Sequence, residues 1–408
     1  MVQQTMTIDA RQVQQLEATS VLQVYRRIPV VLVRGEGSHL FDADGKEYID
    51  LLSGIGVASL GHAHPGLADA LAAQARELLH TSNLFFHPLQ GQVASALADL
   101  SGLDRAFFTN SGTEAVEACL KFARRFWFTN GSPRRTELVA FDRSFHGRTF
   151  GALSVTSGAP YREPFEPLVP GVTFISPDDP ASLHRAASDR TAAIIVEPIQ
   201  GEGGVWPLSA AMSTAIRTTC AETGALLIAD EIQCGLGRTG RPFHSAALDL
   251  KPDLMPLGKA LGGGVPVGAA LMTERVAEAI AFGDHGSTYG GNLLACRAAL
   301  VFLGALQDGL VDRVDTAGAR VEARLRLLAE RYDVIKEIRG SGLMWGLDLD
   351  ESVAERMVGT ALKHGLIINR TAGTVIRLLP PLTISDDDID AGLDRLDSAL
   401  ESAIAGGT

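Results

Sequence analysis

The sequence predicts an α/β protein, with a large domain around a mostly parallel central sheet and a smaller α+β domain made from both chain ends. Two observations predict the large domain: short apolar runs alternate with helical stretches from about residue 105 to 270, and polar, glycine-containing segments follow the runs. A third observation predicts the smaller domain: the two chain ends mix short strands and helices without that alternation. With 408 residues, the chain is long enough for two domains.

The two ends each contain a recognisable local element. Residues 30–50 are expected to form a small antiparallel element with residues 42–46 as its turn. Near the other end, apolar residues keep helical spacing from 389 to 404, after a capping box expected at Ser385 and Asp388. We therefore expect three parts, listed in order: 1–70, the N-terminal part of the small domain; 71–305, the large domain; 306–408, the C-terminal part of the small domain.

The central region alternates strands and helices. The expected buried strands are 105–108, 137–141, 192–196, 225–229 and 269–272, and the expected helices are 113–128 and 209–223. This alternation favours a parallel sheet covered on both faces, and such sheets bind ligands beyond the carboxyl ends of their strands. The segments 110–113, 144–148, 197–202 and 230–233 all follow such strands. We therefore expect them to form one site.

Composition excludes several classes of protein. The net charge of −12 and the pI of about 5.3 do not favour a nucleic-acid-binding surface. Cys119, Cys220, Cys234 and Cys296 are scattered without metal-ligand spacing, which indicates reduced cysteines and no metal site. The N-terminus lacks an apolar signal segment, and no stretch is expected to reach the roughly 18 apolar residues of a membrane span. We expect a cytoplasmic protein with no membrane or nucleic-acid partner.

Lys259 and Asp230 suggest cofactor chemistry. Lys259 follows one apolar run and precedes a glycine cluster, and a lysine held beside apolar groups can lose its proton and attack an aldehyde. Asp230 ends a second run, and a buried acid needs a cationic partner, such as a protonated pyridine nitrogen. A solvated loop lysine and an ordinary acid at a strand end are the alternatives. Together the two residues favour a site for pyridoxal phosphate.

Residues 110–115 follow a strand and open a helix. Free N–H groups and the positive end of the dipole make a helix start an anion site, to which the hydroxyls of Ser111 and Thr113 add donors. A plain helix N-cap is the alternative. Lys259 does not belong to a nucleotide-binding P-loop, because Asp253 stands where that motif needs glycine and Ala260 where it needs Ser or Thr.

Several other side chains are candidates for ligand binding. Phe145 could stack on a planar ring, and Arg148 could take a carboxylate through two parallel hydrogen bonds. Arg377 lies within an apolar run, so it needs an anionic partner, either a structural carboxylate or a substrate. Glu197 and Glu202 flank a tight loop and could serve as acid/base groups or restrain a nearby arginine.

Taken together, these segments resemble the class III (ornithine-type) pyridoxal phosphate aminotransferases of fold type I. The resemblance covers nearly the whole chain, from residues 40–45 to residues 380–381. The strongest segments are 61–65, 108–114, 145–149, 197–202, 230–240, 259–264 and 285–292. Two positions depart from the common pattern: Val116 stands where many relatives have Asn, and Leu293 where many have Pro. Neither is assigned a catalytic role.

The resemblance implies that the chain binds pyridoxal 5'-phosphate. Lys259 would form the Schiff base with it and move protons, and Asp230 would keep its ring nitrogen protonated. The other cofactor-binding residues implied are Ser111, Gly112, Thr113, Phe145, Gln233 and Thr288. Thr288, with Ser287 beside it, would reach in from the partner subunit. A homodimer with shared active sites is therefore expected.

The resemblance also implies how substrates bind, with Arg148, Arg377, Glu202, Glu197, Ser287 and Ile55 as the substrate-binding residues. Arg377 would take an α-carboxylate and exchange it for Glu202, and Arg148 would take the second carboxylate of 2-oxoglutarate. Ile55 stands where ornithine-specific members have a tyrosine, which favours the subgroup acting on N2-acetylornithine. The expected ping-pong reaction moves the δ-amino group to 2-oxoglutarate, giving N-acetylglutamate 5-semialdehyde and glutamate for arginine biosynthesis.

Related activities stay open from the sequence. Succinylornithine, free ornithine, 4-aminobutyrate or an acylated lysine precursor could be the amine donor, because one methylene changes binding by only about 1–3 kcal/mol. The same fold also hosts aminomutases and decarboxylases. A non-catalytic binding protein would be expected to lose Lys259, Asp230 or Arg377, and all three are present.

Overall fold

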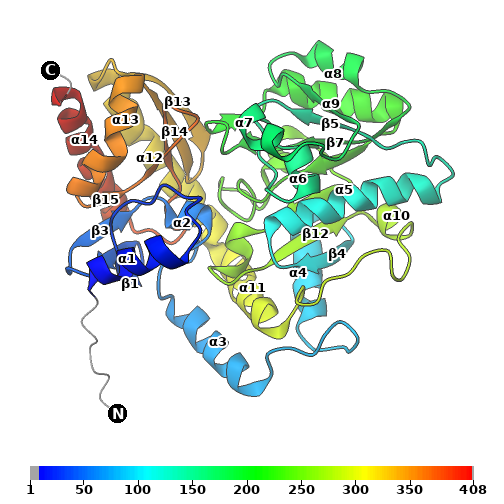
Figure 1. Cartoon of the computed structure of the whole chain (residues 1–408), viewed down its shortest axis with the longest axis horizontal. Helices are drawn as coiled ribbons and strands as arrows, with labels where there is room; N and C mark the ends of the chain where they lie inside the picture. The colour runs from blue at the N-terminus through cyan, green and yellow to red at the C-terminus, as the bar shows by residue number, and fades with distance from the viewer. Residues whose placement is uncertain (1–8, 407–408) are drawn as a thin grey trace.

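The computed structural model describes residues 9–406, which form a larger and a smaller body side by side (Figure 1). The larger body is built on a seven-stranded sheet of order β4-β12-β11-β10-β7-β5-β6. Its strands are β4 (Arg105–Thr109), β5 (Glu137–Phe141), β6 (Val172–Ile175), β7 (Thr191–Val196), β10 (Leu226–Ala229), β11 (Leu254–Leu257) and β12 (Gly268–Met272). Only β12 runs antiparallel to its neighbours. The expected mostly parallel α/β fold is confirmed.

Helices cover both faces of this sheet. Alternate residues of β5 point to opposite faces: Leu138 packs in the cluster of α5, and Val139 packs in that of α8 and α9. All six residues of β7 are buried, as expected for a strand covered on both sides. The helices of the larger body are α3 (Pro65–Glu77), α4 (Gln90–Ser101), α5 (Gly112–Thr129), α6 (Phe150–Ser154), α7 (Ala159–Arg162), α8 (Pro180–Ala186), α9 (Ala210–Thr223), α10 (Glu274–Ala277) and α11 (Leu293–Ala305).

The five expected strands and both expected helices of the central region are present, but β6 and β11 were not predicted from the sequence. β11 contains Pro256, which cannot donate a ladder hydrogen bond and argues against an interior strand. β6 is only four residues long, and only its last residue, Ile175, is buried.

The smaller body takes strands from both ends of the chain. One sheet has the order β1-β2-β3-β15 and the other β13-β14-β17-β16. Their strands are β1 (Leu32–Glu36), β2 (His39–Asp42), β3 (Glu47–Asp50), β13 (Ile335–Ser341), β14 (Met344–Leu349), β15 (Leu366–Ile367), β16 (Asn369–Thr371) and β17 (Val375–Leu378). Strands β1 to β3 are antiparallel, as expected, whereas β15 pairs parallel with β3. The exact domain boundaries near residues 70 and 305 stay predictions.

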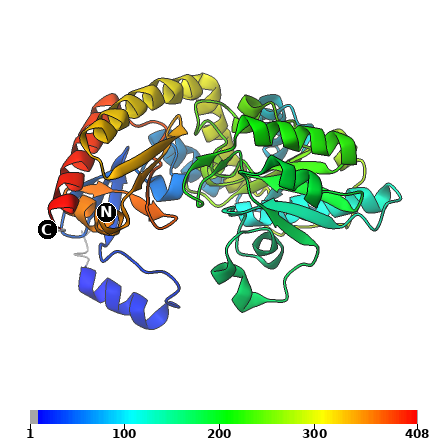
Figure 2. The same cartoon turned by 90° about the horizontal axis from the view of Figure 1, so that it is seen from above.

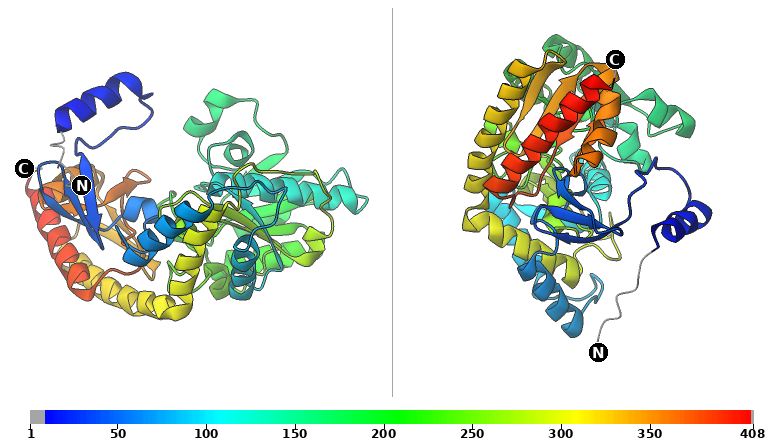
Figure 3. Two further views of the ribbon diagram at one scale, coloured as in Figure 1. Left: turned by 90° about the horizontal axis from the view of Figure 1, so that it is seen from below. Right: turned by 90° about the vertical axis from the view of Figure 1, so that its left-hand side faces the viewer.

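Helices α12 (Val311–Arg331), α13 (Glu351–Lys363) and α14 (Asp386–Ala405) belong to the smaller body, and α12 curves along its outer side (Figure 2). Helix α1 (Ala10–Ser20) has no buried residue and stands apart from both bodies (Figure 3). The remaining short elements are α2 (Ser53–Gly56), the β8 (Ile199–Gln200) and β9 (Trp206–Pro207) pair, and the segments η1 (Glu163–Phe165), η2 (His244–Leu248), η3 (Lys259–Gly262) and η4 (Leu306–Leu310).

The stretch Leu293–Arg331 corrects one expectation. By length and composition it is apolar enough to cross a membrane, with a hydropathy of 1.5 over its window, of which 39% is buried. The expectation that no stretch approaches a membrane span is therefore wrong here. Core helices of soluble proteins pass the same test. The α11 part packs in the main core through residues such as Phe302, and non-helical angles at Asp308 and Gly309 interrupt the stretch.

The start of α14 follows the sequence only in part. Ser385 is the N-cap, and its hydroxyl accepts a hydrogen bond from the Asp388 N–H at 3.0 Å. The reciprocal half of the expected capping box is absent, because the Asp388 carboxylate binds the hydroxyl of Ser38 at 2.5 Å and the ring of His39 at 3.0 Å. Asp388 thus ties the last helix to the antiparallel element near the start of the chain.

Replacing the N-cap of α14 should weaken the smaller body. We expect Ser385→Ala to lower the free energy of unfolding by about 1 kcal/mol, because the Asp388 N–H loses its acceptor. Urea unfolding followed by circular dichroism measures this. Ser398→Ala is the matched control: Ser398 is exposed inside the same helix, and its loss should not destabilise the protein. Equal stabilities of Ser385→Ala and the wild type would contradict the capping role.

Candidate active site

Loops at the carboxyl edge of the parallel strands enclose a cavity of about 280 Å³, called the inner cavity below. The residues lining it are Gly112, Thr113, Phe145, His146, Gly147, Arg148, Glu197, Glu202, Asp230, Ile232, Gln233 and Lys259. They follow β4, β5, β7, β10 and β11, so five strands of one sheet contribute to one site. The expected convergence of the loop segments is confirmed.

Lys259 is the first residue of η3, and only Gly258 separates it from the end of β11. Its backbone has φ of 40°, in the left-handed region, which costs a residue with a side chain about 1–2 kcal/mol. Burial lowers the pKa of the Lys259 ammonium, and the positive charge of Arg377 lowers it further against the attraction of nearby carboxylates. A lysine with a lowered pKa loses its proton more readily and becomes a nucleophile.

Asp230 is buried and bound on both carboxylate oxygens. Oδ1 accepts a hydrogen bond from the Ile232 N–H at 3.1 Å, and Oδ2 lies 2.7 Å from Nδ1 of His146. The His146 ring is itself buried, and its Nε2 has no partner among residues 9–406. His146 was not predicted from the sequence to have a role. The only feature of the sequence that could have indicated a role for His146 is its position, beside Phe145, in a loop after a buried strand.

Glu197 fixes two neighbouring loops. One carboxylate oxygen accepts from the Phe145 N–H at 2.8 Å, and the other accepts from the Gly201 N–H at 3.2 Å. Burial raises the pKa of Glu197 to about 7, helped by the negative charge of Asp230 and opposed by His146 and the two N–H groups. Glu197 therefore holds the backbone of Phe145 and Gly201 in the wall of the inner cavity.

Arg377, on β17 of the smaller body, reaches the site through Glu202 and Gln233. The side chain is fully buried, and Nη1 donates to Glu202 Oε1 at 2.6 Å and to Gln233 Oε1 at 3.1 Å. Burial raises the pKa of Glu202, but the attraction of Arg377 outweighs it and the pKa falls. Nη2 of Arg377 has no partner among the described residues, so this buried cation keeps a free donor.

The start of helix α5 forms one end of the inner cavity. Ser111 is the N-cap, and its hydroxyl accepts from the Glu114 N–H at 3.3 Å; its role toward a phosphate stays a prediction. Thr113 lies 3.0 Å from Thr149, hydroxyl to hydroxyl, and Thr149 donates to Glu117 at 2.6 Å. The first N–H groups of a helix have no acceptor within it, so this end of the cavity suits an anion.

A glycine is required beside Thr113. At Gly147 a Cβ atom would lie 2.1 Å from the Thr113 hydroxyl, and the backbone has φ of 131°. The hydroxyl of Thr113 can therefore approach the loop after β5 only because this residue has no side chain. Gly147 lies in the segment 145–149, but the spacing of that segment does not predict this contact.

Besides Ser111 and Arg377, described above, three expected site residues are absent from the lining of the inner cavity: Ser287, Thr288 and Ile55. Ser287 binds locally, accepting from Asn110 Nδ2 at 3.4 Å and from the Gly290 N–H at 2.9 Å. Thr288 is exposed, and Ile55 on α2 is 38% exposed. A single chain does not bring these three side chains to the cavity, and their roles stay predictions.

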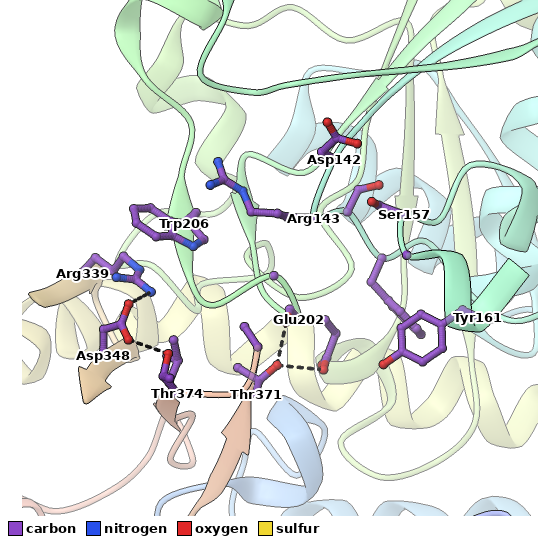
Figure 4. Close-up of a pocket in the computed structure, with 16 residues that line it drawn as sticks. Asp142, Arg143, Ser157, Tyr161, Glu202, Trp206, Arg339, Asp348, Thr371 and Thr374 are labelled. Atoms are coloured by element: carbon purple, nitrogen blue, oxygen red, sulfur yellow. Dashed lines mark hydrogen bonds and ion pairs between the residues drawn. The ribbon is translucent and has the colours of Figure 1, made fainter. Parts of the chain in front are cut away.

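A second cavity of about 660 Å³, called the outer chamber below, adjoins the inner cavity and shares Phe145 and Glu202 with it. Tyr161 and Trp206 lie on opposite sides of this chamber, with Glu202 and Thr371 between them (Figure 4). The Thr371 hydroxyl donates to the backbone oxygen of Glu202 at 2.6 Å. The loop that carries Glu202 is thus tied to β16 of the smaller body.

The residues of the inner cavity fit pyridoxal 5'-phosphate. A helix start suits its phosphate, a buried carboxylate suits its ring nitrogen, and a lysine of lowered pKa suits its aldehyde. The unpartnered Nη2 of Arg377 indicates that an acceptor is missing beside them. A lysine and a buried acid at the carboxyl edge of such a sheet define a pyridoxal phosphate site.

Comparison with known proteins agrees with this class. A family model described as aminotransferase class-III matches residues 21–400. The chain is 44% identical to the acetylornithine aminotransferase of Methanocaldococcus jannaschii over 94% of this chain and 97% of that protein. The chain therefore belongs to the class III aminotransferases, which are pyridoxal-phosphate-dependent transaminases.

Two solved structures are similar over nearly their whole length. The acetylornithine aminotransferase of Elizabethkingia anophelis has a TM-score of 0.86 and 31% identity, over 97% of this chain and 100% of that one. An ornithine aminotransferase of Toxoplasma gondii, with pyridoxal phosphate partially occupying its active site, has a TM-score of 0.93 and 33% identity. The match covers 98% of this chain and 96% of that chain.

Stability of the cofactor-free protein should depend on pH through Glu197. Its folded pKa of about 7 exceeds the ordinary glutamate value of 4.5, so the folded state binds more protons between these two pH values. The resulting stabilisation is present at low pH and is lost as the pH rises through 7. Relative to the wild type, Glu197→Gln should therefore gain about 2 kcal/mol of stability between pH 5 and pH 8.

Urea unfolding of the two proteins at several pH values measures the difference. The control is Glu278→Gln, in which an exposed carboxylate is replaced and the variant's stability should run parallel to that of the wild type. A Glu197→Gln curve that also runs parallel to the wild type would contradict a carboxyl group protonated by burial.

Proposed function

We propose that this chain is an acetylornithine aminotransferase. It moves the δ-amino group of N2-acetyl-L-ornithine to 2-oxoglutarate in two half-reactions, giving N-acetyl-L-glutamate 5-semialdehyde and L-glutamate in arginine biosynthesis. The observation that carries the proposal is the buried ion pair of Arg377 and Glu202 beside Lys259, because its carboxylate can be exchanged for that of a substrate. The name and 44% identity of the M. jannaschii relative support the donor.

Bound pyridoxal phosphate supplies an electron sink for the carbon that loses or gains the amine. In our proposal Lys259 holds the cofactor and then moves the proton on the reacting carbon. Asp230, held by His146 and the Ile232 N–H, would bind the ring nitrogen. Phe145 forms the ring-facing wall, and Gly112 and Thr113 hold the phosphate.

The two arginines divide the substrate carboxylates in our proposal. Arg148 takes the α-carboxylate of acetylornithine in one half-reaction and the distal carboxylate of glutamate or 2-oxoglutarate in the other. Arg377 takes the α-carboxylate of the latter pair. When acetylornithine is bound, Glu202 returns to Arg377, so the buried cation is never left without a counter-charge.

Free ornithine is the nearest alternative donor, since the similar T. gondii structure is an ornithine aminotransferase. The side chain at position 55 favours acetylornithine. Ile55 carries no hydroxyl that could bind the charged α-amino acid end of free ornithine, whereas the tyrosine expected there in ornithine-specific relatives has one.

A homodimer and a cytoplasmic location are part of the proposal. Exposed large apolar side chains support an interface, because they need cover from water: Leu22, Val24 and Tyr25 after α1, Leu84, Phe85 and Phe86 before α4, and Phe282 and Tyr289 near Thr288. Such an interface would cover the loop of Ser287 and Thr288 and could direct these residues to the inner cavity of the partner.

Loss of the lysine should abolish the reaction. We expect Lys259→Ala to have no measurable turnover with acetylornithine and 2-oxoglutarate, because neither the cofactor bond nor the proton transfer can form. Lys251→Ala, which removes an exposed lysine near the start of β11, is the control and should retain wild-type turnover. A coupled assay of glutamate formation measures both. Retained activity in Lys259→Ala would overturn the mechanism.

The donor is tested by half-reactions on the holoenzyme. N2-acetylornithine, ornithine and 4-aminobutyrate are added separately without 2-oxoglutarate, and the cofactor absorbance is followed by stopped flow. We expect the absorbance change to be fastest with acetylornithine by at least about tenfold, the size of a binding difference of about 1.4 kcal/mol. A faster change with ornithine or 4-aminobutyrate would keep the aminotransferase and replace the proposed donor.

A further inference from the structure

The guanidinium group of Arg148 is held by aromatic rings and not by an acid. Its Cζ atom lies over the ring of Tyr161, 3.8 Å from the centroid, and 5.5 Å from the centroid of Phe145. No hydrogen bond or ion pair joins Arg148 to any residue between 9 and 406. Ring faces attract a cation without accepting its N–H groups. The donors of Arg148 therefore stay available to a ligand.

The other arginines around the two cavities are placed differently. Each pairs with a carboxylate: Arg143 with Asp178 at 2.8 Å, Arg339 with Glu337 at 2.7 Å and Asp348 at 3.1 Å, and Arg377 with Glu202 at 2.6 Å. Arg339 also lies over Trp206, across the chamber from Tyr161, but its charge is already neutralised (Figure 4). Arg148 alone among these four is stacked and lacks a carboxylate partner in the part of the chain that the structure describes.

The position of Tyr161 is built into the turn before it. Gly158 has φ of 104°, and a Cβ atom there would lie 3.3 Å from Cδ2 of Tyr161, so the ring fits against this turn because glycine has no side chain. The Tyr161 N–H donates to the Gly158 oxygen at 3.0 Å. The neighbouring Ser157 N–H donates to the Ser144 oxygen at 2.9 Å. The turn is therefore bonded to the loop that carries Phe145 and Arg148.

We propose that Tyr161 is a positioning residue for carboxylate binding. Its ring holds the Arg148 guanidinium at the boundary between the outer chamber and the inner cavity, with the N–H groups free for the carboxylate that both substrates present there. Because no acid pairs with Arg148, a substrate carboxylate can bind it without displacing a protein carboxylate. At Arg377, by contrast, the substrate carboxylate must displace Glu202. This inference rests on the carboxylate-binding role of Arg148 in the proposed function.

The test compares three variants of the holoenzyme: Tyr161→Leu, Tyr161→Phe and, as control, Phe165→Leu. Phe165 is an exposed aromatic residue four positions further along the same segment. Steady-state kinetics give KM and kcat for N2-acetylornithine and for 2-oxoglutarate. The single-turnover rate with n-pentylamine, a donor without a carboxylate, is measured alongside.

We expect Tyr161→Leu to raise both KM values roughly two- to fivefold, the usual size of a partly exposed cation–π contact, with kcat retained. The rate with n-pentylamine should not change, because Arg148 has no carboxylate to bind. Tyr161→Phe keeps the ring and should behave like the wild type, as should Phe165→Leu. This pattern assigns the effect to the ring and to carboxylate recognition, and not to loosening of the segment.

Three results would overturn the inference. Unchanged KM values in Tyr161→Leu would show that the stack does not position Arg148. An equal loss with n-pentylamine would show a general structural effect, and a Phe variant as impaired as the Leu variant would assign the effect to the hydroxyl. If the wild type does not use N2-acetylornithine, the proposed donor fails, and the KM for 2-oxoglutarate with any accepted donor still tests Tyr161.

Discussion

The ion pair of Arg377 and Glu202 is the interaction on which the rest of the site depends. Arg377 lies on a strand of the smaller body and Glu202 on a loop of the larger body, so the pair joins the two across the active site. A buried cation without a counter-charge costs several kcal/mol. The bodies must therefore meet with a carboxylate at this point. Because a substrate carboxylate meets the same need, the interaction that joins the bodies can also bind substrate.

The two arginines proposed to bind substrate carboxylates, Arg377 and Arg148, are held in different ways. With a net charge of −12, the chain repels dicarboxylate substrates unless particular cations reverse the local field. Arg377 is fully buried and must be neutralised between substrates, which requires an acid that can move. Arg148 is exposed at the cavity boundary, where water limits the cost of its charge, and aromatic faces suffice to orient it. Of these two arginines, the buried one has a carboxylate partner and the exposed one has none among the described residues.

The sequence predicts what depends on local pattern. The central strands and the loops at their carboxyl ends follow from apolar runs and their spacing, and these loops do form one cavity. The prediction fails where tertiary structure overrides a local rule or where the partner is distant in sequence. β11 was not predicted because it contains Pro256, and the Asp388 carboxylate binds Ser38 and not the backbone of its own helix start. The stack of Tyr161 on Arg148 depends on the turn geometry at Gly158, which no spacing reveals.

Several features that lower the stability of the folded chain lie around one cavity. Lys259 has a left-handed backbone, Glu197 is buried with a raised pKa, and Nη2 of Arg377 lacks an acceptor. Each of these features lowers the free energy of unfolding, which in proteins is only about 5–15 kcal/mol. Other interactions must therefore compensate for having several of them at one site. The buried sheet supplies part of this compensation. A ligand that binds only the folded chain supplies the rest, since its binding free energy adds to stability. The strain at Lys259 therefore follows from the task of the site and not from a fault in the fold.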